Sequence, residues 1–216
     1  LMHAMGPNVA GVIGSAVALF ETNLKRLLAY SSVAQIGYIL LGASMVSVLG
    51  LSAGLLHMFN HALAKGALFL AVLCLALRVG SLDLRQLSGA ARQMPWTMGA
   101  LVLGGLSLIG VPGTAGFISK WYLVSAALNE GPLGVLLIAV IVAGSLMAVV
   151  YIWRIVETAW FQAPEAGAPK LTEAPLPVLL VPWSVALANR WFGLAPALPL
   201  RLSAAAAESL LRHLPP

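Results

Sequence analysis

Apolar stretches of about 20 residues dominate this chain, and that is the length an α-helix needs to cross about 30 Å of hydrocarbon. Hydrophobic residues make up 60% of the 216 positions and charged residues only 9%, whereas a soluble domain carries roughly 25% charged residues. The stretches are rich in Leu, Ala, Gly and Val and lack the strict alternation of a membrane β-strand. The sequence therefore predicts an all-α fold, a polytopic transmembrane helical bundle.

Six membrane spans are predicted, each bounded by polar or helix-breaking residues. They cover residues 5–21, 27–48, 51–78, 96–128, 133–160 and 175–192. Residues 193–216 are predicted to form a C-terminal tail or a surface helix. A polar connector at residues 78–95 is suited to a short amphipathic helix on the membrane surface. Because the chain starts at the approach to a span, with no signal peptide, we expect it to be part of a longer protein.

The fourth span is predicted to be one helix with a break in its middle, at residues 110–113. Pro112 lacks a backbone N–H, and its ring clashes with the preceding turn. Three glycines, Gly110, Gly113 and Gly116, surround it. Each half is only about 15 residues long, which is too short to cross the bilayer alone. Backbone groups freed by such a break are tolerated at membrane depth where they line a polar cavity or are buried in protein.

Counting six spans puts most basic residues on one side of the membrane. These are Lys25, Arg26, Arg78, Arg85, Arg92, Arg154 and Lys170. By the positive-inside tendency that side is cytoplasmic. The net charge of +5 is thus explained by membrane orientation, and the expected surroundings are a lipid bilayer and not nucleic acid.

His57, His61 and Lys65 recur every four residues in the third predicted span. On a helix, successive members step by about 40° and climb about 6 Å, so they form a slanted ladder. Histidine titrates near neutrality, and two histidines one turn apart can pass a proton through bridging water. A charged lysine at the centre of a membrane helix costs about 2.5 to 3.5 kcal/mol on insertion scales. The ladder predicts a proton or ion relay; helix-to-helix hydrogen bonding and a Lys65 that reaches the membrane interface are the structural alternatives.

No metal or cofactor is predicted. Histidines at i and i+4 can ligate zinc or iron, but no second histidine pair or carboxylate cluster completes a ligand shell around His57 and His61. The single cysteine, Cys74, and the lack of a Gly-rich loop after a strand exclude iron–sulfur and nicotinamide sites. Any redox chemistry must therefore belong to partner subunits, and the chain itself has no catalytic centre.

Lys120 follows Pro112 by about two helical turns and is predicted to join the relay. Transporters place ion sites at breaks in membrane helices, where freed backbone dipoles and water are available. The alternative is an interfacial anchor formed by Lys120 with Trp121 and Tyr122.

Three ordered motifs cover about residues 5–160. They are Asn23-Leu-Lys25-Arg-Leu-Leu-Ala-Tyr30-Ser31-Ser32-Val-Ala-Gln35-Ile-Gly37-Tyr38, His57-x3-His61-x3-Lys65, and Gly110-Val-Pro112 followed by Gly116-Phe117-Ile-Ser-Lys120. In these motifs the chain resembles the membrane subunits shared by respiratory complex I and the Mrp-type cation/proton antiporters, and residues 109–123 look closest to the antiporter D subunit.

The resemblance implies fourteen core helices in two inverted repeats, of which this chain would hold the last six, in a multi-pass protein of the cell inner membrane. It implies that Lys120, Lys65, His57 and His61 form the distal part of a half-buried proton route. The glutamate and lysine of the first repeat have no match in this chain, and Gly113 stands where relatives often have a second proline.

We therefore expect a subunit of a multisubunit cation/proton antiporter, which moves H+ in exchange for Na+ or another cation and assembles with other membrane subunits. The alternatives are a proton-pumping membrane subunit of an NADH:quinone oxidoreductase or related hydrogenase complex, and a structural subunit that transports nothing.

Overall fold

The computed structural model describes residues 2–164 and 170–213, and within these ranges the chain is helical and contains no strand. The main helices are α1 (Met2–Phe20), α2 (Leu24–Ser44), α3 (Val48–Ala76), α5 (Pro95–Ile109), α6 (Ala115–Ala127), α7 (Pro132–Val156), α8 (Leu176–Leu194) and α9 (Ala197–Arg212). Shorter turns are a 3-10 helix at Leu84–Leu87, α4 (Ala90–Gln93), a 3-10 helix at Leu128–Glu130 and a π-helical turn at Glu157–Phe161. The predicted all-α fold is confirmed.

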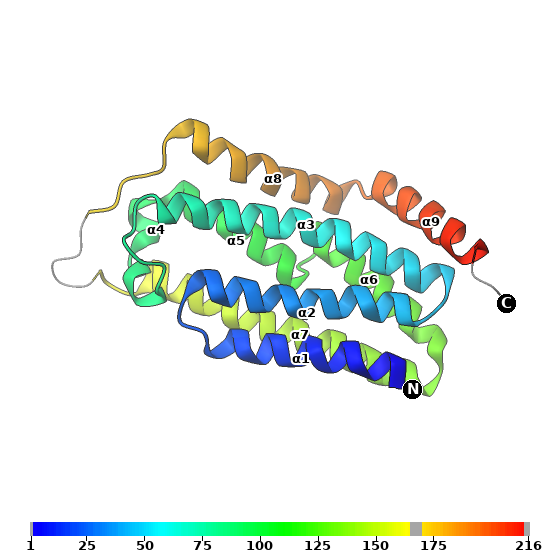
Figure 1. The fold of residues 1–216 in the computed structure, drawn as a ribbon. Helices are drawn as coiled ribbons and strands as arrows, with labels where there is room; N and C mark the ends of the chain where they lie inside the picture. The colour runs from blue at the N-terminus through cyan, green and yellow to red at the C-terminus, as the bar shows by residue number, and fades with distance from the viewer. Residues whose placement is uncertain (1, 165–169, 214–216) are drawn as a thin grey trace.

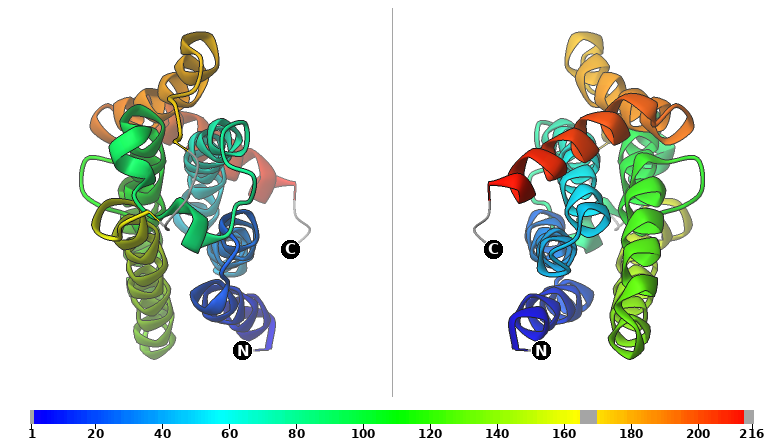
Figure 2. Two further views of the ribbon diagram at one scale, coloured as in Figure 1. Left: turned by 90° about the vertical axis from the view of Figure 1, so that its left-hand side faces the viewer. Right: turned by 90° about the vertical axis from the view of Figure 1, so that its right-hand side faces the viewer.

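Helix α3, which carries the histidine–lysine ladder, lies in the middle of the bundle. It packs against α2, α5, α6, α8 and α9. Helix α7 packs against α1, α2, α5 and α6, and so it closes the side of the bundle away from α8 (Figures 1 and 2). The ladder is therefore enclosed by other helices along most of its length.

Helices α2 and α3 approach each other closely because glycines face each other across their contact. A Cβ added to Gly42 of α2 would lie 2.7 Å from the Cα of Gly54 and 2.7 Å from the carbonyl oxygen of Gly50, both on α3. Small residues allow membrane helices to pack backbone against backbone in this way. The contact fixes the polar residues of α2 beside those of α3.

Among the described residues, three helices are long and apolar enough to cross a membrane on their own. These are α2, α3 and the continuous run from α7 through its π-helical turn, Pro132–Phe161. Helices α8 and α9 pass the same test only together, with a bend of 77° between them. Because α5 has 15 residues and α6 has 13, the fourth predicted span is interrupted, and the assignment of six spans stays a prediction.

The connectors that follow α1, α3 and α7 meet at one end of the bundle, at the left of Figure 1. The amide of Leu24 donates to the carbonyl of Leu82 at 2.8 Å, and the amide of Gly89 donates to the carbonyl of Thr158 at 3.3 Å. Most of the basic residues counted above lie in or next to these connectors. The polar connector at residues 78–95 forms the short helices at Leu84–Leu87 and Ala90–Gln93.

The glycine contact between α2 and α3 predicts the effect of one added methyl group. Gly42→Ala should lower the free energy of unfolding by about 1 to 3 kcal/mol, because the new Cβ overlaps the backbone of α3. The measurement is thermal unfolding of the purified full-length protein in detergent. Gly80→Ala is the control, because no atom lies within 4 Å of a Cβ at that position. Equal melting temperatures for the two variants would contradict the packing described above.

Candidate functional site

The ladder residues lie on one face of α3, but they differ in burial. His57 is 2% exposed and Lys65 is 7% exposed, whereas His61 is half-buried. The two imidazole rings are stacked, with their centroids 6.3 Å apart and their planes 10° apart. The geometry thus places both histidines one above the other, as the spacing in the sequence predicts.

Lys65 points into the bundle and makes its hydrogen bonds with α2. Its Nζ donates to the carbonyl of Leu28 and to the hydroxyl of Ser31, each at 2.5 Å. It also lies 5.8 Å from the centroid of the Phe69 ring. The alternative in which Lys65 extends to the membrane interface does not fit this buried position.

His57 is held from two helices at once. Its Nδ1 lies 2.9 Å from the hydroxyl oxygen of Ser119 on α6, and its Nε2 lies 3.1 Å from Oε1 of Gln35 on α2. The edge of the Tyr38 ring meets the imidazole at a centroid distance of 5.5 Å and an angle of 86°. The ring therefore has a fixed orientation between α2 and α6.

The break between α5 and α6 is built by glycine and proline, as the sequence predicts. Helix α5 ends at Gly110 with a φ of 93°, a left-handed conformation that glycine adopts without strain. Pro112 follows, and Gly113 has a φ of 84°. Gly116 packs so closely against Ser107 that an added Cβ would overlap its carbonyl oxygen.

Lys120 caps the end of α5 from inside the break. Its Nζ donates to the carbonyls of Leu108 at 3.0 Å and Ile109 at 2.8 Å, and to the hydroxyl of Ser145 on α7 at 2.9 Å. These three acceptors match the three N–H groups of an ammonium, and two of them are at the negative end of the helix dipole. Lys120 is 6% exposed, whereas its neighbour Trp121 is 60% exposed, so Lys120 is not an interfacial anchor.

Helix α8 covers the break from the other side. Nη1 of Arg190 donates to the carbonyl of Gly113 at 3.2 Å. Gly193, at the end of α8, lies so close to Thr114 that an added Cβ would overlap its backbone. The bend between α8 and α9 therefore sits directly against the break between α5 and α6.

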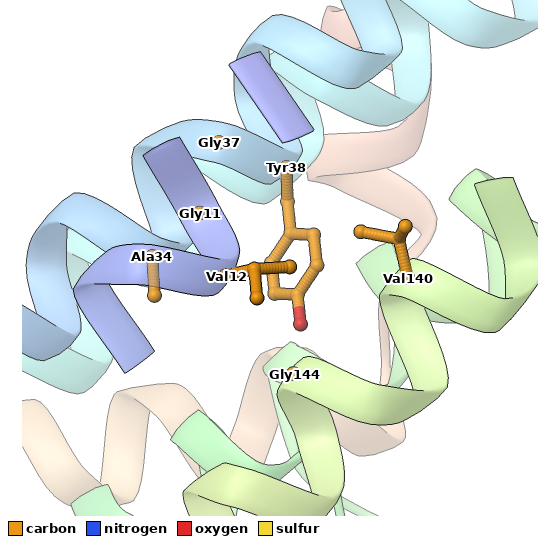
Figure 3. A pocket seen from close by; sticks show the side chains of 7 residues that line it. All are labelled: Gly11, Val12, Ala34, Gly37, Tyr38, Val140 and Gly144. Carbon is orange, nitrogen blue, oxygen red and sulfur yellow. The ribbon is translucent and has the colours of Figure 1, made fainter. Parts of the chain in front are cut away.

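Two pockets lie beside these residues. One, of about 320 Å³, opens between α6 and α7; its lining is apolar except for Lys120 and Ser145. The other is a space of about 10 Å³, enough for about one water, between α1, α2 and α7. Figure 3 shows the Tyr38 side chain extending across it toward Gly144. The Tyr38 hydroxyl donates to the carbonyl of Ile141 at 3.2 Å, and only a glycine at 144 leaves space for it.

Residues 6–147 match the family described as NADH:quinone oxidoreductase/Mrp antiporter, transmembrane. The chain belongs to this family. It is 44% identical over 170 residues to NADH-quinone oxidoreductase subunit N of Desulforudis audaxviator, an alignment that covers 78% of this chain and 33% of that protein. It is 39% identical over 133 residues to hydrogenase-4 component B of Escherichia coli, covering 56% of this chain and 20% of that one.

A solved structure shows the same fold. A chain of the Mrp complex from Dietzia sp. superposes with a TM-score of 0.89 at 26% identity, over 97% of this chain and 47% of that one. The predicted resemblance to the family shared by complex I and the Mrp-type antiporters is confirmed, and the protein is an integral membrane protein of this family. The chain spans about a third of the length of subunit N from Desulforudis audaxviator.

The polar face of α2 in this family member is a part of the site that sequence reasoning missed. Ser31, Gln35 and Tyr38 are spaced by four and three residues and so share one helix face. Ser31 bonds Lys65, Gln35 bonds His57, and the ring of Tyr38 lies 5.2 Å from Nζ of Lys120. The residues lie in a motif used for the resemblance, and their spacing was the signal that could have identified them.

Some predicted members of the relay are not in direct contact. Lys65 bonds α2 and not His61, and Nδ1 of His61 is a buried atom without a hydrogen-bond partner among the described residues. The same holds for Oδ1 of Asn60 and the hydroxyl of Tyr151. Buried polar atoms of this kind are normally satisfied by ordered water, so these three atoms are candidate hydrogen-bond partners for water.

The hydrogen bond from Arg190 to the carbonyl of Gly113 is expected to stabilise the backbone between α5 and α6. Arg190→Gln should increase hydrogen–deuterium exchange of the backbone amides at residues 110–118 by about fivefold, since the lost hydrogen bond is worth about 1 kcal/mol. Mass spectrometry of the full-length protein in detergent measures this exchange. Arg201→Gln on α9 is the matched control, because Arg201 is also an exposed arginine and is not part of the hydrogen bond between Arg190 and Gly113. Unchanged exchange in the Arg190 variant would show that α8 does not stabilise the break.

Proposed function

We propose that this chain forms part of the proton path of a multisubunit membrane complex, with Lys65, His61, His57 and Lys120 as the groups that carry the proton. The observation that supports this most directly is the set of partners around the two lysines. Lys65 and Lys120 are buried, yet they bond only hydroxyl and carbonyl oxygens of the described residues, and no carboxylate. A buried cation that serves structure is normally paired with an acid.

Neutral partners suit a lysine that must gain and lose a proton. The hydroxyls of Ser31 and Ser145 can either accept from an ammonium or donate to an amine, so each lysine keeps a hydrogen bond in both charge states. When either lysine loses its proton, no buried carboxylate is left without a cation beside it, because the partners are neutral. This arrangement lowers the cost of changing the charge at membrane depth.

The remaining steps need water and other parts of the protein. Water between Lys65 and His61 would bridge the gap, and the unpartnered atoms of His61, Asn60 and Tyr151 offer it hydrogen bonds. We propose that the rest of the full-length protein supplies the entry half of the path and that other membrane subunits supply the driving reaction. The pocket of about 320 Å³ between α6 and α7, which Lys120 and Ser145 help to line, gives one opening toward the Lys120 side chain.

Replacement of either lysine tests the relay. Lys120→Met and Lys65→Met in the full-length protein, in its complex, should reduce proton uptake into inverted membrane vesicles by about tenfold or more, because a relay group is lost. Proton uptake is followed with a pH-sensitive dye, and assembly by native electrophoresis. Lys25→Met serves as the control, since Lys25 is an exposed residue at the start of α2. Normal uptake in the Lys120 variant would refute the proposal, and loss of assembly alone would support a structural role.

Two driving reactions are candidates, and each has an observation in its favour. The 44% identity to subunit N of an NADH-quinone oxidoreductase favours a redox-driven complex, whose redox groups lie in partner subunits. The TM-score of 0.89 against the Mrp complex supports a cation/proton antiporter that exchanges H+ for Na+. The relay is the same in both.

Energising the vesicles in two ways separates these candidates. For a redox-driven complex, addition of NADH or another electron donor should drive proton uptake, and an imposed Na+ gradient without a donor should not. The Lys120→Met complex provides the background for both measurements. Proton movement driven by the Na+ gradient alone would identify the complex as an antiporter.

A further inference from the structure

We infer that Gln35 is a positioning residue that fixes the tautomer of His57, so that His57 exchanges its proton at Nδ1, the nitrogen facing Ser119 on the broken helix. This inference rests on the proposed function, because it concerns how one member of the relay works. It assigns a separate task to each ring nitrogen. Nε2 keeps its hydrogen, and Nδ1 is the nitrogen that gains and loses one.

The side-chain amide of Gln35 determines which ring nitrogen of His57 carries the hydrogen. Oε1 of Gln35 lies 3.1 Å from Nε2 of His57, and a carbonyl oxygen can only accept a hydrogen bond. The hydrogen of a neutral imidazole is therefore held on Nε2. Protonation of the ring must then take place at Nδ1.

Ser119, on the other side of the ring, can hydrogen-bond Nδ1 in either charge state of the imidazole. The hydroxyl oxygen of Ser119 lies 2.9 Å from Nδ1 and 3.2 Å from the carbonyl oxygen of Gly116. With a neutral ring, the Ser119 hydroxyl donates to Nδ1. With a protonated ring, Nδ1–H donates to the Ser119 oxygen, and the serine hydrogen turns to the Gly116 carbonyl. Both charge states keep their hydrogen bonds without movement of a heavy atom.

Among the described residues, the His57 ring has hydrogen-bond partners only in Gln35 and Ser119. His57 and Gln35 are each 2% exposed, and Ser119 is fully buried. The titratable groups that face His57 are His61 on α3, Tyr38 on α2 and Lys120 on α6. None of these three groups is a carboxylic acid, so the amide of Gln35 occupies the place where an aspartate or glutamate would hold the ring in its protonated form. A neutral acceptor orients the ring and still allows it to release the proton.

The test uses two substitutions in the full-length protein in its complex. Gln35→Met has a side chain of similar length but no hydrogen-bond acceptor of the amide type. It should reduce the maximal rate of proton uptake about tenfold. The concentration of driving substrate that gives half of the maximal rate should stay unchanged. Gln35→Glu keeps an acceptor at Nε2 and should restore ring orientation, but its charge should move the pH profile of transport to higher pH. Gln86→Met, in the exposed connector, is the matched control.

A spectroscopic measurement addresses the tautomer directly. Nitrogen-15 solid-state NMR of His57 in the assembled complex should show the neutral ring protonated at Nε2, and in Gln35→Met a mixture of the two tautomers. A neutral ring protonated at Nδ1 in the unmodified protein would overturn the inference. So would an unchanged rate in Gln35→Met or an unchanged pH profile in Gln35→Glu, the variant that preserves the size of the side chain.

The outcomes also distinguish this inference from the proposed function. If Lys120→Met abolishes proton uptake and the Gln35 variants transport normally, the relay stands and the role of Gln35 is wrong. If Lys120→Met transports normally, the relay itself is wrong, whatever the Gln35 variants do.

Discussion

The constraint that governs this structure is that backbone and charged groups at membrane depth must find partners inside the protein. A break in a spanning helix leaves carbonyls without their usual donors, and a buried lysine has donors without acceptors. In this protein the free carbonyls and the buried lysine satisfy each other, because Lys120 donates hydrogen bonds to the carbonyls of Leu108 and Ile109. The group that caps α5 is thus also one of the groups proposed to carry the proton.

Helix α2 likewise provides hydrogen-bond partners inside the protein for buried side chains along α3. Its close glycine contact with α3 brings Ser31 and Gln35 to the side chains of Lys65 and His57. Tyr38 then extends the polar face to Lys120 at the break. A continuous row of neutral hydrogen-bonding groups therefore follows the ionisable groups, and it allows them to remain buried without permanent counter-ions.

The sequence was sufficient for the features that depend on local rules. Hydrophobic stretches indicated the helices, the four-residue spacing indicated the shared face of His57, His61 and Lys65, and Gly110 with Pro112 indicated the break. It was not sufficient for contacts between residues far apart in the chain, because helical periodicity does not specify which faces meet. One partner of His57 lies 62 residues away in Ser119, and one partner of Lys65 lies 34 residues away in Ser31. Arg190 was also missed, since its bond to Gly113 depends on how α8 crosses the break.

The position of Gly193 against Thr114 has a mechanical consequence. With no space between the two backbones, the loop that joins α5 to α6 has no room to move outward unless α8 moves with it. Rearrangement near Lys120 would therefore be transmitted to the kink between α8 and α9 and along α9, which rests on α3. The close contact couples the α8–α9 pair to the α5–α6 pair. Helix α8 therefore limits how far the loop between α5 and α6 can move.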